Sequence, residues 1–167
     1  PLVEIVTQPD VRSGEEARRV LQLLRQTVVE LGISDAEMEK GSLRCDANVS
    51  VREAGEEGYR TKTELKNMNS FKFVADGITA EVERQIAVYE AGGEVVQQTL
   101  HFDPQKGTIA PLRSKEEAHD YRYFPEPDLP PLVVSREWVR DVEAGLPELP
   151  ADKRRRFVTQ HGLPDYD

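Results

Sequence analysis

Two neighbouring segments, residues 41–51 and 59–67, alternate between apolar and polar side chains along most of their length. Successive side chains of a β-strand point to opposite faces of a sheet, so this alternation predicts two half-exposed strands. The stretch between them, residues 53–58, is acidic and contains two glycines. Such a stretch predicts a hairpin loop, and the two strands are therefore expected to pair with each other.

This hairpin gathers charged and amide side chains on one face of the predicted sheet. Carboxylates and cations placed side by side, followed by Asn67 and Asn69, indicate a place where phosphate, metal and substrate meet. The alternative is an exposed sheet with salt bridges and no site, because such ion pairs are common and individually weak. The polar positions are Arg44, Asp46, Asn48 and Ser50 on the first strand, and Arg60, Lys62, Glu64 and Lys66 on the second.

The remaining pattern predicts helices and strands around the hairpin. Ser13 begins a capping box before a run with helical spacing, and Ser70 is placed to cap a second helix. The predicted helices are residues 13–31 and 71–91, and the further strands are residues 2–7, 94–102 and 108–113, the first of them buried. On the second helix the expected buried line is Val74, Ile78, Val82 and Ile86.

The order of these elements is a repeated β-α-β-β pattern. It predicts an α+β fold with a largely antiparallel sheet, helices on one face and the charged side chains on the other. A short strand over 132–134 is expected next, followed by a helix over 136–143, a proline-containing linker and a basic helix ending near His161. We therefore assign residues 1–134 to one domain, and residues 135–167 to a linker and the start of a helical domain.

Composition excludes some classes of function. The net charge of −9 argues against a protein that holds nucleic acid by overall attraction. DKRRR at 152–156 is a local basic strip, which could contact nucleic acid or could simply be the solvated face of a helix. No apolar run approaches the ~20 residues that span a bilayer, and the first residues lack the basic start of a signal peptide. We expect a soluble, cytoplasmic protein. The single cysteine, Cys45, excludes an internal disulfide and is expected to be a buried, unreactive thiol.

Four stretches of the chain resemble a known family. They are PLVEIVTQPD at 1–10, GSLRCDAN at 41–48, TELKNMNSF at 63–71 and DYRYFPEPD at 120–128. These strings, which follow one another in this order over nearly the whole chain, resemble the B subunit of the aspartyl/glutamyl-tRNA amidotransferases of bacteria and organelles. The B subunit is much longer, so the resemblance implies that this chain is an internal part of it.

The resemblance implies a cytoplasmic enzyme that converts the glutamate or aspartate carried by a misacylated tRNA into glutamine or asparagine. In this family ATP phosphorylates the side-chain carboxylate of Glu-tRNA(Gln) or Asp-tRNA(Asn), and ammonia derived from glutamine displaces the phosphate to give the amide. The expected cofactors are ATP and Mg²⁺. The expected partners are the A and C subunits of the amidotransferase and the misacylated tRNA, with no membrane. The catalytic fold is expected to be similar to that of glutamine synthetase.

The chemistry of this reaction suggests roles for particular residues. Mg²⁺ takes one or two carboxylates with water and phosphate, and we assign Glu4 and Asp46 as its ligands because each looks out of place unless a positive charge faces it. Cations must brace the phosphates, and amides can bind nucleotide or substrate. The remaining assignments are catalytic roles for Glu64, Lys66 and Arg122, and nucleotide-binding roles for Arg44, Asn48, Lys62 and Asn67.

A second hypothesis is a non-catalytic module that binds tRNA or docks another protein of the complex. Convergence of Glu4, Asp46 and Glu64 within metal-bridging distance would favour the enzyme, and a solvent-facing Glu4 remote from Asp46 would weaken it. These residues alone are expected to be inactive, because part of the metal shell and the glutaminase partner would lie outside them.

Overall fold

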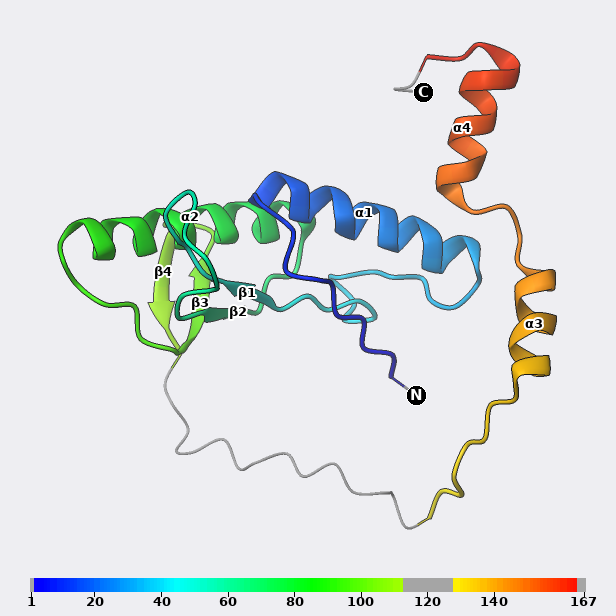
Figure 1. The fold of residues 1–167 in the computed structure, drawn as a ribbon, viewed down its shortest axis with the longest axis horizontal. Coiled ribbons are helices and arrows are strands. Elements are labelled where there is room, and N and C mark those ends of the chain that lie inside the picture. The colour runs from blue at the N-terminus through cyan, green and yellow to red at the C-terminus, as the bar shows by residue number, and fades with distance from the viewer. Residues whose placement is uncertain (1, 113–127, 165–167) are drawn as a thin grey trace.

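The computed structural model describes residues 2–112 and 128–164 of the chain. Four helices and four strands occur in this part (Figure 1). In chain order they are α1 (Gly14–Glu30), β1 (Ala47–Val49), β2 (Thr63–Lys66), α2 (Phe71–Glu90), β3 (Thr99–Asp103), β4 (Thr108–Pro111), α3 (Arg136–Gly145) and α4 (Pro150–His161).

The four strands form one sheet in the order β1-β2-β3-β4. β1 pairs with β2, and β3 with β4, in antiparallel fashion, whereas β2 and β3 are parallel and are connected through α2. The predicted hairpin, the α+β class and the largely antiparallel sheet are therefore confirmed. The strands are shorter than predicted: β1 has three residues and β2 four, and β3 begins at Thr99 rather than at Glu94.

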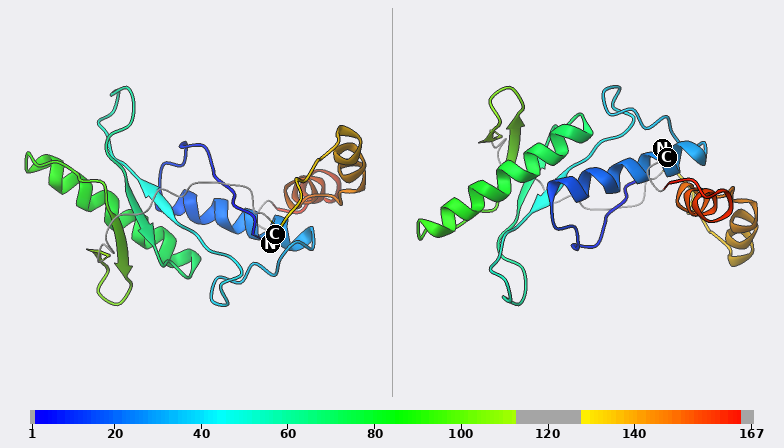
Figure 2. Two further views of the ribbon diagram at one scale, coloured as in Figure 1. Left: turned by 90° about the horizontal axis from the view of Figure 1, so that it is seen from below. Right: turned by 90° about the horizontal axis from the view of Figure 1, so that it is seen from above.

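Helices cover one side of this sheet. Both α1 and α2 lie on that side, with α2 against the strands and α1 packed on α2 (Figure 2). Leu65 of β2 and Leu100 of β3 are at most 1% exposed and pack with Val74 of α2. Burial of a large apolar side chain contributes about 1.5–3 kcal/mol. This apolar layer therefore determines which side of the sheet is left for polar residues.

A buried polar cluster, made of Thr63, Glu81, Arg84 and Gln85, joins α2 to the β1–β2 hairpin. Thr63, Glu81 and Gln85 are at most 1% exposed. Glu81 Oε1 accepts hydrogen bonds from Thr63 Oγ1 at 2.7 Å and from Gln85 Nε2 at 2.8 Å. The Arg84 guanidinium donates to both carboxylate oxygens of Glu81 at 2.8 Å. Because an unpaired charge in the interior is strongly destabilising, these donors are what allow Glu81 to be buried.

The prediction for the buried line of α2 is only partly correct. Val74 is buried as expected, but Ile86 is 39% exposed, and the other two predicted positions are partly buried. The further positions facing the sheet belong to Gly77, Glu81 and Gln85. Hydrophobic periodicity marks only apolar residues, so it misses polar side chains that are buried because hydrogen bonds satisfy them.

The first turn of α1 lies very close to α2. Ser13 caps α1, as predicted, by accepting a hydrogen bond from the Glu16 amide at 3.1 Å. The next residue, Gly14, is buried, and a Cβ atom added there would lie 2.3 Å from the carbonyl oxygen of Ala75 on α2. A backbone carbonyl cannot move aside as a flexible side chain can. Glycine is therefore required for this helix contact.

Two predicted strands are absent from the described residues. Residues 2–7 have no regular structure, and Leu2, Val3 and Val6 are 94%, 72% and 80% exposed, so the expected buried strand is wrong. The short strand expected over 132–134 is likewise irregular and exposed. A strand is stable only when its backbone groups pair with a neighbour, and neither segment pairs with the described sheet.

The helices α3 and α4 lie to one side of the sheet and its two covering helices (Figure 1). Neither has a fully buried residue. An ion pair of 2.6 Å between Lys153 Nζ and Glu30 Oε1 links α4 to the end of α1. Arg156 of the basic strip pairs with Glu148 at 2.7 Å, so part of the charge of that strip is balanced within the chain. None of the described helices combines the length and apolarity needed to cross a bilayer.

We expect Gly14→Ala to destabilise the protein, because the added methyl group collides with a backbone carbonyl of α2. Overpacking of this kind costs about 1–3 kcal/mol, which thermal unfolding detects as a lower midpoint. The matched control is Gly145→Ala, since Gly145 also belongs to a helix and a Cβ there meets no atom within 4 Å. Equal midpoints for the two variants would contradict the close contact of α1 with α2.

Glu81 should make a specific contribution to stability in acid. Burial by itself would raise the pKa of Glu81, but hydrogen bonds from Arg84, Thr63 and Gln85 outweigh this effect and hold the pKa below its ordinary value of 4.5. A carboxyl group of this kind stabilises the fold above its unfolded pKa, and the contribution is lost as the pH falls through the lower folded pKa.

Glu81→Gln is therefore expected to lower the free energy of unfolding at neutral pH, and to make it depend less on pH in the acid range. Chemical denaturation at neutral pH and at a pH below the ordinary pKa of glutamate measures both effects. If the variant loses as much stability between the two conditions as the parent protein does, Glu81 is not the ionised group inferred from its hydrogen bonds.

Candidate functional site

The side of the sheet that faces away from the helices carries the polar residues of the hairpin. We call Asp46, Asn48, Glu64, Lys66 and Thr99 the polar face. The register places Asn48 of β1 beside Glu64 of β2, and Glu64 beside Thr99 of β3. Because strand side chains alternate and the intervening residues are buried under α2, these side chains share the open side of the sheet.

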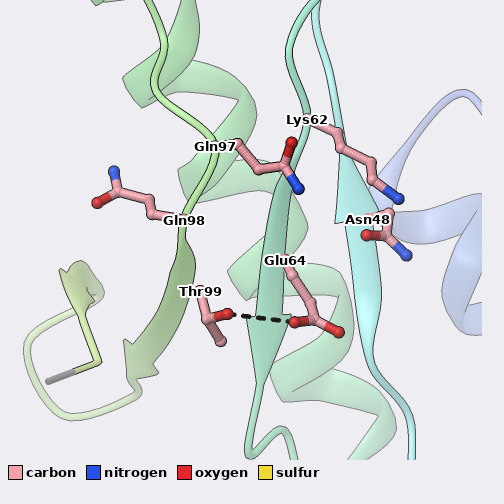
Figure 3. A pocket seen from close by; sticks show the side chains of 6 residues that line it. All are labelled: Asn48, Lys62, Glu64, Gln97, Gln98 and Thr99. Carbon is pink, nitrogen blue, oxygen red and sulfur yellow. Dashed lines mark hydrogen bonds between the residues drawn. The ribbon is translucent and has the colours of Figure 1, made fainter. Parts of the chain in front are cut away.

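A pocket of about 340 Å³ opens on this side (Figure 3). In Figure 3, Lys62 and Asn48 approach it from the hairpin, and Gln97 approaches from the segment before β3. Thr99 Oγ1 donates a hydrogen bond of 3.2 Å to Glu64 Oε2 and so orients that carboxylate. Lys62 and the amides suit an anionic ligand that also accepts hydrogen bonds, whereas the carboxylate of Glu64 suits a cation or a hydrogen-bond donor. The lining residues are Asn48, Lys62, Glu64, Gln97, Gln98 and Thr99.

Lys66 lies between two carboxylates next to this pocket. Its Nζ is 3.4 Å from Glu64 Oε1 and 3.7 Å from Asp46 Oδ2. Partial burial by itself would lower the pKa of Lys66, but the two carboxylates outweigh it and raise that pKa, so the amine is protonated at neutral pH. The three side chains remain 35–49% exposed. Such ion pairs add little to stability, and their charges stay accessible to a ligand.

The predicted Mg²⁺ ligands do not come together in the described residues. Glu4 is exposed in the irregular segment before α1. Within residues 2–112 and 128–164, no three acidic, histidine or cysteine side chains are arranged to hold a metal ion. Asp46 and Glu64 share one face with Lys66 between them. The convergence of Glu4, Asp46 and Glu64 that would have favoured the enzyme is therefore not found among the described residues. Because Mg²⁺ often takes only one or two carboxylates from a protein, Asp46 and Glu64 still fit its donor set, and the assignment of Glu4 stays a prediction.

The other predicted residues lie apart from the pocket. Arg44 is exposed in the segment before β1 and does not line the pocket. Asn67 follows β2 with a φ of 62°, a left-handed conformation that asparagine adopts more readily than most residues, so a backbone turn also accounts for its identity. Arg60, expected on the polar face, instead places its guanidinium over the ring of Tyr89 on α2. Arg122 lies outside the described residues.

The sequence pattern of the hairpin does not reveal the other half of the pocket. Gln97 and Gln98 come from the segment that leads into β3, and Thr99 is the first residue of β3. Thr99 alternates with the buried Leu100, so the period of two in this strand is a signal that could have identified it. The parallel pairing that brings Thr99 beside Glu64 is not visible in the sequence, because a whole helix separates the two strands.

Cys45 lies just before β1 and packs partly against the hydrophobic core. Burial, together with the negative charge of Asp46, raises the pKa of its thiol to about 11. The thiolate is the nucleophilic form of cysteine, and it is scarce at neutral pH in a group with such a pKa. The structure therefore agrees with the prediction of an unreactive thiol.

These features define a class of protein: a mixed α+β domain with helices on one side of its sheet and a pocket lined by charged and amide side chains on the other. The family model described as the GatB/GatE catalytic domain matches residues 1–140. The chain belongs to this family, and the resemblance found in its sequence is confirmed.

Its relatives include proteins named as the B subunit of aspartyl/glutamyl-tRNA(Asn/Gln) amidotransferase. The one from Geotalea daltonii is 59% identical over 167 residues, which make up 100% of this chain and 35% of the relative. Those from Carboxydothermus hydrogenoformans and Burkholderia multivorans are 54% and 56% identical over the whole chain, and the matches cover 35% and 34% of these relatives. The chain thus spans about a third of the length of the curated relatives it matches.

We expect Cys45 to react slowly with an alkylating reagent at neutral pH, because a thiol pKa of about 11 leaves little thiolate. Mass spectrometry of the modified peptide follows this residue alone. Unfolding in denaturant is the control, since it removes the burial and should raise the rate about a hundredfold as the pKa returns toward its ordinary range. Equal rates in the folded and the unfolded protein would contradict the burial of this thiol.

Proposed function

We propose that this protein is part of an amidotransferase subunit that converts the amino acid carried by a misacylated tRNA into its amide. ATP phosphorylates the side-chain carboxylate of Glu-tRNA(Gln) or Asp-tRNA(Asn), and ammonia then displaces the phosphate to form the amide. Membership of the GatB/GatE catalytic domain family and the names of its relatives support this proposal.

The polar face meets the main physical demand of this reaction. Bringing ATP to a carboxylate places negative charges close together, so cations and hydrogen-bond donors must balance them. Lys62 and Asn48 offer such groups in the pocket beside Glu64, and Lys66 offers a second cation next to the same carboxylate. The single observation that carries the proposal is this concentration of cations and amides on the open side of a sheet whose other side is buried.

Each residue has a chemical task in the proposed site. Lys62 and Asn48 bind the phosphates of ATP. Lys66, protonated and held by Glu64, stabilises the charge on the group being transferred, and Glu64 keeps that amine in place. Arg44 and Asn67 are proposed to contribute to nucleotide binding, as the sequence predicts. Arg122 is proposed to act beside Lys66 on the phosphoryl group.

A divalent cation fits the donor set of the same face. Mg²⁺ supplies charge neutralisation at the phosphates when it is bound. Asp46 and Glu64 would offer it carboxylate oxygens, and Glu4 remains a proposed further ligand from the segment before α1. In the absence of a phosphate, Lys66 supplies the positive charge between these two carboxylates.

The proposal includes the assembly in which the reaction takes place. The A subunit of the amidotransferase would release ammonia from glutamine, and the C subunit would hold the complex together in the cytoplasm. Residues 1–134 are proposed to form part of a catalytic domain with a fold similar to that of glutamine synthetase. Residues 135–167 are proposed to begin a helical domain.

Glu64→Gln in the full-length protein, assembled with its partners, tests this function. We expect amide formation on Glu-tRNA(Gln), and phosphate release from ATP, to fall about a hundredfold, because the replacement removes a charge that orients Lys66 in the site. The matched control is Glu83→Gln, since Glu83 is exposed on α2, on the other side of the sheet. Parental rates in Glu64→Gln would contradict a catalytic role of the polar face.

A measurement of tRNA binding separates this function from the alternative, a non-catalytic module that binds tRNA or docks another protein of the complex. If Glu64→Gln binds Glu-tRNA(Gln) as tightly as the parent enzyme but amidates it slowly, the polar face is catalytic. If the replacement weakens tRNA binding and leaves phosphate release from each bound complex unchanged, the polar face is a docking surface.

A further inference from the structure

We propose that the buried polar cluster positions the polar face, with Thr63, Glu81 and Gln85 as its positioning residues. This inference rests on the proposed function of that face. The cluster lies on the covered side of the hairpin and does not line the pocket. Its role follows from the atoms of the hairpin that it holds.

Gln85 binds the backbone of the hairpin as a neighbouring strand would. Its Nε2 donates a hydrogen bond of 3.0 Å to the carbonyl oxygen of Val49, and its Oε1 accepts one of 3.1 Å from the amide of Val51. A side-chain amide offers donor and acceptor groups as a peptide does. Gln85 therefore continues the hydrogen bonding of β1 beyond its last residue, Val49.

Thr63 is held through its hydroxyl group. Its Oγ1 donates a hydrogen bond of 2.7 Å to Glu81 Oε1 and lies 3.0 Å from Gln85 Nε2, whose two hydrogens are shared among this oxygen, Glu81 Oε1 and the carbonyl of Val49. Thr63 lies directly opposite Val49 in the antiparallel register. The helix α2 thus holds both members of one cross-strand pair.

The neighbouring cross-strand pair belongs to the polar face. Asn48 precedes Val49, Glu64 follows Thr63, and these two polar residues lie opposite each other. Lys62, on the other side of Thr63, lines the same pocket. Because side chains alternate along a strand, holding Thr63 toward α2 turns Lys62 and Glu64 toward the open side.

The hairpin depends on these contacts because its strands are very short. β1 has three residues and β2 four, so few ladder hydrogen bonds fix their register. A slip of one residue would move Asn48 or Glu64 to the covered side of the sheet. The connection over residues 50–62 is too long for turn geometry to set the register. Directional hydrogen bonds from α2 supply the missing constraint.

A purely structural cluster and a positioning cluster predict different results. If the cluster only stabilises the fold, its loss lowers the fraction of folded molecules and leaves each folded molecule fully active. If it positions the polar face, folded molecules lose turnover. The measurement that decides is therefore kcat for each folded enzyme molecule.

The experiment compares Thr63→Val with Thr63→Ser in the full-length protein assembled with its partners. Valine keeps the shape of threonine and removes the hydroxyl group, whereas serine keeps the hydroxyl group. We expect Thr63→Val to lower kcat for amide formation by about a hundredfold, the size of loss that an ångström-scale misplacement of a catalytic group causes. Thr63→Ser should restore most of this loss.

Val74→Ala is the matched control on the same helix. Val74 is 0% exposed and belongs to the apolar core, so its truncation destabilises the fold by leaving a cavity and removes none of the hydrogen bonds of the cluster. Its kcat for each folded molecule should equal that of the parent enzyme. A circular dichroism melt of every variant gives the folded fraction.

Parental kcat in folded Thr63→Val would overturn the proposal and leave the cluster a structural feature. If Thr63→Val does not fold, Gln85→Met takes its place with the same two outcomes, because methionine keeps the length of glutamine and removes the hydrogen bonds to Val49 and Val51. Failure of the proposed function would be a different result, since it would appear as parental turnover in Glu64→Gln, within the pocket itself.

Discussion

A buried carboxylate, that of Glu81, determines how the helices and the sheet of this protein meet. A buried charge is tolerated only when donors surround it, and Thr63, Arg84 and Gln85 provide them. Because these donors come from both α2 and β2, the carboxylate is satisfied only when the helix has one rotation and one height above the hairpin. Apolar burial is non-directional and would permit other arrangements. The cluster thus adds specificity to a contact whose stability comes from apolar burial.

The consequence is a sheet in which residues of the covered face and residues of the open face alternate along the same short strands. On the covered face, Leu65 is buried in the core and Thr63 bonds to α2. On the open face, Glu64, which lies between them in the chain, faces Asn48 and accepts a hydrogen bond from Thr99. A site built on strands is held more accurately than one built on loops, because the pairing and packing of neighbouring residues fix the position of each strand residue. In the proposed site, the chemistry of the open face therefore depends on packing that it does not touch.

Local patterns predicted one half of the site, and non-local contacts account for what they missed. Alternation within the hairpin places Asn48 and Glu64 on one face, since that period involves adjacent residues alone. Thr99 reaches the site only through a parallel pairing across α2. Glu81 escapes a search for apolar periodicity because the groups that satisfy it include one on another element. Residues 2–7 show the opposite error: their apolar composition predicts a strand, but no strand among the described residues pairs with them.

Hydrogen exchange at the amide of Val51 tests most directly whether α2 holds the hairpin. Val51 lies beyond the end of β1, and its amide donates to the buried Oε1 of Gln85 at 3.1 Å. We predict that this amide exchanges as slowly as that of Leu65 in the core of the sheet, because it can open only when α2 separates from the hairpin. Exchange as fast as that of Glu57, in the exposed loop of the hairpin, would contradict the account.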